Sequence, residues 1–134
     1  MSIFVNSTDL IRVSVKFRTL TDSQKRVVGI EILPDDAVGA DVQEIVCDTT
    51  GRDFDNMSKL LESATIINHV TGQPMIRSAV FHRGIISRFF KGWNVDDENG
   101  QQVELNNEAV SRMHDSLVRA LSRKWLKTTA GKVK

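Results

Sequence analysis

A strict alternation of apolar and polar side chains near the start of the chain sets the strongest limit on the fold. Within residues 11–18 the apolar positions are Ile11, Val13, Val15 and Phe17, and every position between them is polar or charged. A period of two with β-branched residues predicts a strand with one buried and one wet face. Sheets that keep one face in water are usually antiparallel. We therefore expect an antiparallel sheet in the first third of the protein.

Two further strands are expected before residue 49. Apolar residues alternate within residues 26–33, and Gly29 argues against a helix interior there. A short helix capped by Thr21 or Asp22 is the alternative for this stretch. Residues 42–47 (VQEIVC) are followed by turn-forming residues at 49–51, which makes a third strand possible there.

Apolar residues at helical spacing predict two helices in the middle of the chain. The first is amphipathic over residues 57–64, and Asp53 or Asp55 is placed to cap its free amides. The second covers residues 74–91 as one helix, because a proline is tolerated at the first helical position. Gly84 in its interior either admits a close neighbour or marks a kink.

A tight turn and a last helix complete the expected fold. Residues 95–103 predict a small hairpin, because their Asn-Gly pair tolerates the positive φ angles of tight turns. The last helix covers residues 107–127 with Asn106 as its cap, and residues 128–134 are expected to form a disordered basic tail. The expected fold class is α+β in a single domain, residues 1–127. It has a small antiparallel sheet of about three strands in the N-terminal third, then three helices, with a short hairpin before the last.

Charge is distributed unevenly along the chain, although the net charge is only +1. Residues 31–62 carry nine acidic and two basic side chains. Residues 1–30 carry five basic and two acidic ones, and residues 106–134 carry seven and two. This pattern favours charge-complementary contact, either within the fold or between copies in a homo-oligomer joined through the acidic middle and the basic ends. A solvated surface with uneven charge is the simpler alternative.

The sequence predicts no catalytic, cofactor or metal site. The three histidines and the single cysteine, Cys47, show no metal-ligand spacing, and the acidic turn at residues 96–100 fails the ligand positions of a calcium loop. Motifs for an activated nucleophile, a P-loop or a dinucleotide fold are absent. We therefore expect a protein that is not an enzyme and uses no cofactor. No apolar run approaches the roughly 20 residues of a membrane span, so no membrane role is expected.

Basic side chains gather on two of the expected helices. Arg77, Arg88 and Lys91 fall on one side of the second helix together with Phe81. A further basic row lies along one face of the last helix. Such rows can neutralise phosphates, but nucleic-acid readers are usually strongly basic, which argues against nucleic acid here. A core role is the alternative for Phe81 and Trp93. The residues expected to contact a partner protein are Arg77, Phe81, Arg88, Lys91, Trp93, Arg119 and Arg123.

Three segments carry a resemblance to a known family. They are a strand with a polar continuation, VSVKFRTLTDSQ at residues 13–24, then FKGWNVDDENG at residues 90–100 and VELNNEAV at residues 103–110. Together they resemble the tail assembly chaperones and related small tail proteins of long-tailed bacteriophages. In such proteins a helix commonly ends at a tryptophan, passes an acidic turn and restarts after a polar cap.

The resemblance implies a non-catalytic tail assembly factor that works in the host cytoplasm. Such a protein would chaperone tape-measure or tail-tube subunits by protein–protein binding, without a cofactor. The strand-rich stretch of residues 26–48 departs from the more helical pattern of that family. It therefore leaves a virion structural subunit, for head–tail joining or tail completion, as the alternative. A small nucleic-acid-binding module is the third possibility.

Overall fold

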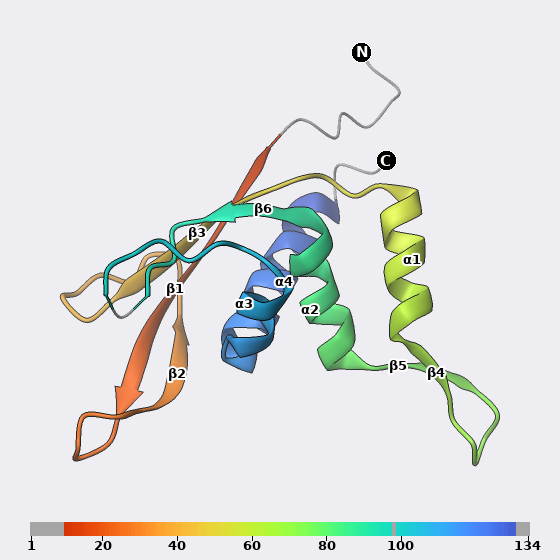
Figure 1. Ribbon diagram of the computed structural model, residues 1–134, viewed down its shortest axis with the longest axis horizontal. Helices are drawn as coiled ribbons and strands as arrows, with labels where there is room; N and C mark the ends of the chain where they lie inside the picture. Colours follow the sequence, from red (N-terminus) through yellow and green to blue (C-terminus); the bar gives the residue numbers. More distant parts are fainter. Residues whose placement is uncertain (1–9, 98, 131–134) are drawn as a thin grey trace.

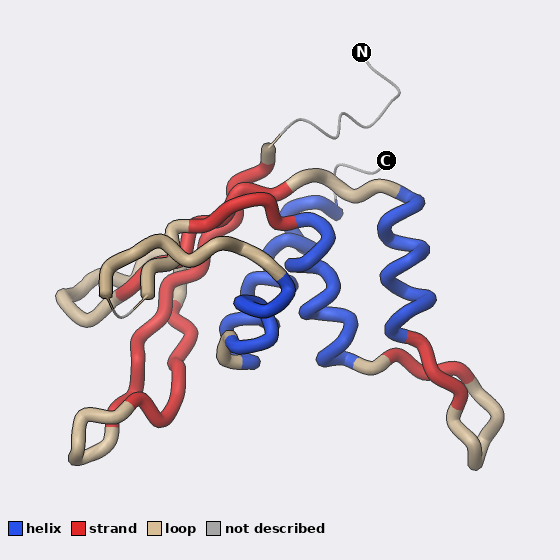
Figure 2. Tube along the Cα trace, viewed as in Figure 1, coloured by secondary structure: helices blue, strands red, loops and turns tan. Residues whose placement is uncertain are grey.

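A four-stranded antiparallel sheet lies on one side of the molecule (Figures 1 and 2). The computed structural model describes residues 10–97 and 99–130. In spatial order the strands are β2 (Val27–Leu33), β1 (Ile11–Thr21), β3 (Gln43–Thr49) and β6 (Phe90–Trp93). The expected α+β class and the three N-terminal strands are confirmed, and the stretch 26–33 contains strand β2 and no helix.

The buried face of the sheet follows from the alternation in β1. Val13, Val15 and Phe17 are buried, whereas the residues between them are not. Val13 lies opposite Cys47 and Val15 opposite Ile45 on β3. Directly opposed residues share a face of a sheet, so these side chains form one apolar surface. Packing that surface against a helix removes it from water, at roughly 25 cal/mol for each Å².

Helices α4, α2 and α1 lie one beyond another from that face, as Figure 1 shows. Helix α4 contacts β1 and β2, α2 packs on α4, and α1 packs on α2. A second, two-stranded sheet of β4 (Thr65–Ile67) and β5 (Pro74–Ile76) joins α1 to α2. The helices are α1 (Phe54–Ala64), α2 (Ser78–Phe89), α3 (Asn107–Arg112) and α4 (Asp115–Ala130). None of these described helices is long and apolar enough to span a bilayer.

Trp125 of α4 is the centre of the core. Its ring is fully buried and stacks on Phe89 of α2, with 4.4 Å between the ring centroids. The indole Nε1–H donates to the Thr50 carbonyl at 2.9 Å. The Arg52 guanidinium lies 5.7 Å from the Trp125 ring centroid and donates to the Leu126 carbonyl and the Thr129 hydroxyl. This cluster fixes the C-terminal half of α4 against the sheet.

The expectation of one helix over residues 74–91 is wrong at both ends. Residues 74–76 pair with β4, and Arg77 is an extended N-cap. At the other end, β6 joins the edge of the main sheet, where Phe90 lies opposite Thr49 and Trp93 opposite Cys47. Strand pairing satisfies the backbone groups that a longer helix would otherwise use, so tertiary context overrides the helical spacing.

Gly84 of α2 admits a close neighbour, which was one of its two expected roles. A Cβ atom at this position would overlap the Cδ1 atom of Leu60 on α1. Helix α1 begins at Phe54 after Asp53, whose side chain accepts from the Asn56 amide at 2.8 Å and so confirms the expected cap. The spacing of α1 from α2 therefore depends on the missing side chain at residue 84.

The last expected helix is divided into α3 and α4. Asn106 caps α3 as expected, accepting from the Ala109 amide, but Met113 is extended and the helix stops there. The Arg83 guanidinium donates to the carbonyls of Val110 and Met113, which compensates the carbonyls that lose helical partners at the break. The hairpin before α3 is confirmed by a bridge between residues 96 and 102, although residue 98 lies outside the described residues.

The disordered tail expected from residue 128 does not begin there. Helix α4 continues to Ala130, and Thr129 is fully buried and bonded to the Trp125 carbonyl and to Arg52. The sequence gives no sign that Thr129 is buried, because its partner Arg52 comes from a loop that is distant in the chain. Residues 131–134 lie outside the described residues.

A candidate binding groove between the sheet and the last helix

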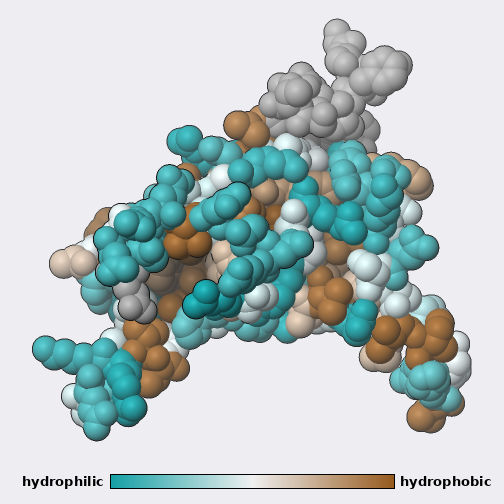
Figure 3. Space-filling model, in the orientation of Figure 1, coloured by the Kyte–Doolittle hydropathy of each residue, from teal (hydrophilic) through white to brown (hydrophobic). Residues whose placement is uncertain are grey.

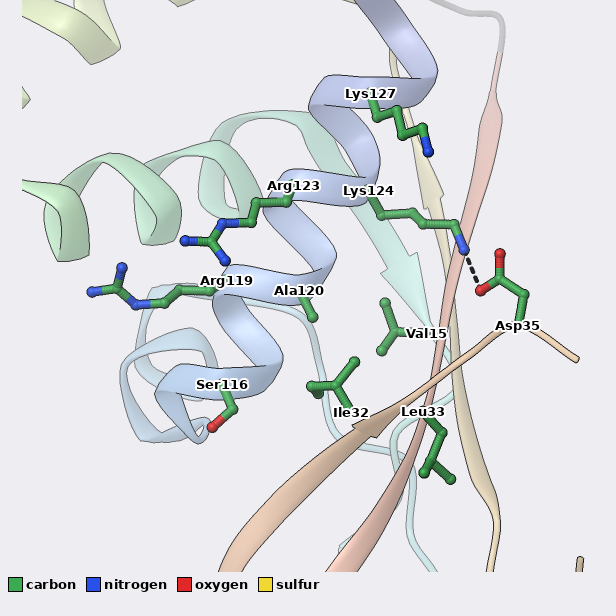
Figure 4. A pocket seen from close by; sticks show the side chains of 10 residues that line it. All are labelled: Val15, Ile32, Leu33, Asp35, Ser116, Arg119, Ala120, Arg123, Lys124 and Lys127. Atoms are coloured by element: carbon green, nitrogen blue, oxygen red, sulfur yellow. Dashed lines mark hydrogen bonds and ion pairs between the residues drawn. The ribbon is translucent and has the colours of Figure 1, made fainter. Parts of the chain in front are cut away.

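An open groove runs between α4 and strands β1 and β2 of the main sheet. Its volume is about 500 Å³. Figure 4 shows α4 on one side of the groove, with β2 and the segment after it on the other. The lining residues are Val15, Ile32, Leu33, Asp35, Ser116, Arg119, Ala120, Arg123, Lys124 and Lys127.

The floor of the groove is apolar. Val15 is buried under it, and Ala120 of α4 is partly buried and packs against the core. Ile32 of β2 remains 40% exposed although Ile30, two residues earlier on the same face, packs against the core. Because β2 is an edge strand, α4 covers only part of it. The uncovered part of that face leaves an apolar strip open to solvent.

The helix side of the groove is basic. Arg119, Arg123 and Lys127 follow one another at a spacing of four, so they share one side of α4. Lys124 reaches across to Asp35 with 2.5 Å between Nζ and Oδ1, whereas Arg119 and Arg123 extend from the helix in the other direction (Figure 4). Among the described residues, Asp35 is the only carboxylate that lines the groove.

Two of these cations have no carboxylate within ion-pair distance in the described part of the chain, namely Arg123 and Lys127. Arg119 is different, since it bonds the Asp115 carboxylate at 2.6 Å and the Ser78 hydroxyl at 2.9 Å. Arg123 and Lys127 are also both exposed. Both are therefore available to an acidic group that approaches from solvent, and Arg123 extends away from the Asp35 side of the groove (Figure 4).

The positive charges on the basic side help to lower the pKa values of two neighbouring titratable groups. The pKa of Asp35 is lowered, first by its hydrogen bond to Lys124 and then by the charges of Lys124, Lys16 and Lys127. The pKa of His82 is lowered mainly by burial, and the charges of Arg119 and Arg123 lower it further. A region that favours a carboxylate and disfavours a second cation is suited to anionic side chains.

Of the seven residues expected to contact a partner, Arg119 and Arg123 line the groove. The other five lie elsewhere. Arg77 donates to the Ser63 carbonyl at the end of α1, and Lys91 donates to the Arg88 carbonyl. Arg88 lines a separate cavity between α1 and α2. The expected side-by-side row of Arg77, Arg88 and Lys91 is wrong, because the first precedes α2 and the last lies in β6.

The two aromatic contact residues occupy the core or its border. Trp93 is only 6% exposed, and its Nε1–H donates to the Val103 carbonyl at 2.8 Å. The structure therefore places Trp93 in the core, which was its alternative role, and its role as a contact residue stays a prediction. Phe81 is partly buried and packs against the core, with its ring 5.5 Å from that of His82 in an edge-on arrangement.

Sequence reasoning missed Lys124, Lys127 and Ile32. The continuation of the basic row at a spacing of four, from Arg119 through Arg123 to Lys127, was a usable signal for the second of them. Ile32 appeared only as part of an alternating strand. Ile32 is exposed because α4 covers only part of β2, and the local sequence pattern does not encode how the helix packs on the sheet.

Part of the acidic middle is paired with the basic ends inside one chain. Arg18 bonds both Glu31 and Asp41, Arg12 lies 3.5 Å from Asp48, and Lys124 pairs with Asp35. All these pairs are solvent-accessible, so each contributes at most about 1 kcal/mol. The charge pattern is thus accounted for in part within the fold, which was one of its expected explanations.

The residues weighed as catalytic or metal-binding candidates are dispersed. Burial raises the pKa of Cys47 to about 12, with a smaller contribution from the charge of Asp48, so its thiol is not a ready nucleophile. Within the described ranges, no three side chains of His, Cys, Asp or Glu converge in a way that would hold a metal ion.

Comparison with known proteins adds no relative. No protein-family model, no curated protein and no solved structure matches the chain.

Proposed function

We propose that this protein is a non-catalytic binding protein that holds an acidic amphipathic helix in the groove between α4 and the sheet. The observation that carries this proposal is the combination of an apolar floor with a basic side. The floor includes the exposed part of Ile32, and the basic side includes Arg123 and Lys127. An amphipathic helix places its apolar face into such a floor while its acidic face meets the cations.

The biological role we propose is tail assembly in a long-tailed bacteriophage, with the tape-measure protein as the partner. This assignment is supported by the resemblance of residues 13–24, 90–100 and 103–110 to tail assembly chaperones. A tape-measure protein is a long helical chain, and its apolar stripes need cover before the tail is built. A groove that accepts one helix face is a suitable form of that cover.

The groove is tested with a labelled amphipathic peptide of about 20 residues that carries leucines on one face and glutamates on the other. Fluorescence anisotropy should detect binding to the wild-type protein. Replacing Arg123→Glu and Lys127→Glu together should weaken binding by about tenfold or more, because two attractive charges become repulsive. The same peptide with lysines in place of glutamates should bind much more weakly to the wild type.

The matched control is the double replacement Arg88→Glu and Lys91→Glu. It reverses the same number of charges outside the groove, and so should leave peptide affinity within about twofold of wild type. If the control loses as much affinity as the groove variant, the groove is not the site. Loss in the control alone would return the contact surface to the end of α2.

Co-expression with the tape-measure protein of its phage tests the biological role. The wild type should keep the tape-measure protein soluble and co-purify with it, and the Arg123→Glu, Lys127→Glu variant should not. A chaperone should also be missing from finished particles, so its detection in purified virions by mass spectrometry would favour the structural-subunit alternative. Tight DNA binding that falls steeply with salt would contradict both assignments.

A further inference from the structure

A second exposed apolar surface lies at the other end of the molecule from the main sheet. We call the segment Thr65–Ile76, which comprises β4, its turn and β5, the ribbon. It projects beyond α1 and α2 in Figures 1 and 2, and Figure 3 shows apolar side chains gathered on it. The exposed large apolar residues of the ribbon are Ile66, Ile67, Val70, Met75 and Ile76.

The ribbon is apolar on both of its faces. Ile66 lies opposite Met75, and Thr65 lies opposite Ile76. Because opposed residues share a face and neighbours alternate, Ile66 and Met75 occupy one face while Ile67 and Ile76 occupy the other. A hairpin that simply faced water on one side would carry polar residues there. On the paired strands of the ribbon, Thr65 is the one polar residue, and it shares its face with Ile67 and Ile76.

The ribbon is nevertheless well defined at its turn and its base. Asn68 accepts from the amides of Val70 and Thr71 through its side chain, and its own amide donates to Gln73. At the base, the Arg77 amide donates to the Ala64 carbonyl at 2.8 Å. The local hydrogen bonds therefore fix the ribbon as a formed hairpin that offers aliphatic side chains to solvent.

An isolated two-stranded hairpin is at best marginally stable in water, and it gains stability when further strands are added. The extensive contacts of β4 and β5 in the described structure are those with each other. Both strands also have one edge that pairs with no other strand of the described sheets. The arrangement therefore lacks the additional strands or packing that such a hairpin requires.

The lack of charge on the ribbon indicates what kind of partner covers its apolar side chains. Residues 63–76 contain no Asp, Glu, Lys or Arg, and His69 is the only ionisable side chain among them. A two-fold contact brings the same patch of two copies together, so a patch with charge of one sign repels its copy and an uncharged patch does not. The basic groove of a second molecule is a poor match, because the ribbon offers it no acidic group.

We propose that two copies of this chain associate through their ribbons, which pair with one another about a two-fold axis. The ribbon exposes on the order of 500 Å² of apolar surface, similar to the largest patch on an ordinary monomer. A standard interface takes about 800 Å² from each partner, so the ribbon supplies most of one side of a small interface. We therefore expect a weak dimer whose formation depends on protein concentration. This inference is independent of the groove.

The test is sedimentation equilibrium of the full chain across a range up to several hundred micromolar. Wild-type protein should pass from monomer to dimer. The variant Ile67→Lys, Met75→Lys places a charge on each face of the ribbon and should remain monomeric. Because these residues are 55% and 46% exposed, the variant should fold, which its melting temperature checks. The control is Val28→Lys, Val38→Lys, which changes two exposed valines outside the ribbon and should dimerise as wild type does.

Several results would overturn the proposal. These are a wild-type protein that stays monomeric throughout, a dimer that persists in the ribbon variant, equal loss of the dimer in the valine control, or an assembly larger than a dimer. Dimerisation through an uncharged ribbon should also change little between about 50 and about 500 mM NaCl. A dimer that dissociates as salt rises would indicate contact between the acidic middle and the basic ends. The Arg123→Glu, Lys127→Glu variant should dimerise normally, so the groove and the ribbon fail or succeed separately.

Discussion

The groove and the ribbon are both apolar surfaces left open to water, but the fold supports them in different ways. The groove floor is the uncovered edge of the main core, where Val15 and Ala120 lie beneath or beside the exposed part of Ile32. The ribbon stands away from that core and is held by its own turn and base. One surface is therefore rigid because of what lies behind it, whereas the other depends on local hydrogen bonds.

Their charges differ just as clearly. Four basic side chains of α4 line the groove, and the ribbon has no acidic or basic side chain apart from His69. Charge around an apolar site selects the partner and raises the association rate more than it adds affinity. The difference teaches that exposed apolar area alone does not identify a partner. The surrounding charge separates a site for an acidic helix from a site for an identical copy.

The largest expected effect contrasts the support of the two surfaces. Trp125→Ala should lower the free energy of unfolding by about 3–5 kcal/mol, because it removes a fully buried aromatic ring that holds α4 in place. Ile67→Ala in the ribbon should change it by less than about 0.5 kcal/mol in the monomer. Urea denaturation, at a protein concentration too low for dimers to form, measures both free-energy changes. Comparable losses would mean that the ribbon packs against the main core in solution.

That contrast also marks what the sequence made predictable. The alternation in β1 predicted both the strand and its buried face, because a period of two is maintained over eight residues and one face is fully covered. The caps at Asp53 and Asn106 were predictable because capping is a local interaction. The ends of α2 were not, since strand pairing decides both of them. Residues 74–76 pair with β4 across a short turn, and β6 pairs with β3, which is distant in the chain.

The groove was half predictable for the same reason. Arg119 and Arg123 were found from helical spacing, which is local. Ile32 and Asp35 join them only through the packing of α4 on the sheet. The role of Trp93 was left open because a tryptophan beside a polar turn has the same local pattern whether its ring faces a partner or the core.

The second-largest expected effect concerns the contact between α1, from which the ribbon begins, and α2. Gly84→Ala should lower the free energy of unfolding by about 1–3 kcal/mol, because the new methyl group overlaps Leu60 of α1. In the background of Leu60→Ala the same change should be much less harmful, since the overlapping atoms are gone. Urea denaturation of the four proteins gives the coupling. Additive losses would contradict a direct contact between the two residues.

Gly84→Ala also separates the two surfaces, because α1 carries the ribbon while α4 carries the groove. We expect the substitution to weaken dimerisation more than it weakens binding of the acidic peptide. Both are measured under conditions in which the wild type and the variant are folded. Equal disturbance of both would show that the two surfaces are coupled through the core.

The third prediction uses the charge beside the groove. His82 is buried, its Nδ1 lies 2.7 Å from the Ser122 hydroxyl, and its pKa is lowered from the ordinary value of 6.5 by burial and then by Arg119 and Arg123. Since the unfolded chain binds the proton more readily, stability should be full above pH 6.5 and fall as the pH drops below it. Denaturation midpoints between about pH 8 and about pH 5.5 measure this loss.

His82→Gln should flatten that profile, because glutamine keeps a polar group near Ser122 and does not titrate. An acidic peptide bound in the groove should reduce the loss as well, since it offsets the charges of Arg119 and Arg123. The ribbon variant should leave the profile as it is. A variant without His82 that loses the same stability over this range would assign the pH dependence to another group.

The smallest expected effect is a gain in binding. Asp35 is the one carboxylate that lines the groove in the described structure, and its ion pair with Lys124 occupies a cation that an acidic partner needs. Asp35→Asn should therefore strengthen binding of the acidic peptide by about two- to fivefold, with the melting temperature nearly unchanged because the pair is solvent-accessible. Glu62→Gln removes an equal charge from α1, outside the groove, and serves as the control for net charge. Anisotropy titrations at low and moderate salt should show the gain for Asp35→Asn alone, and the gain should shrink as salt rises. Equal gains in both variants would mean that peptide affinity responds only to the net charge of the protein. The groove would then be no better supported than the ribbon as the site for an acidic partner.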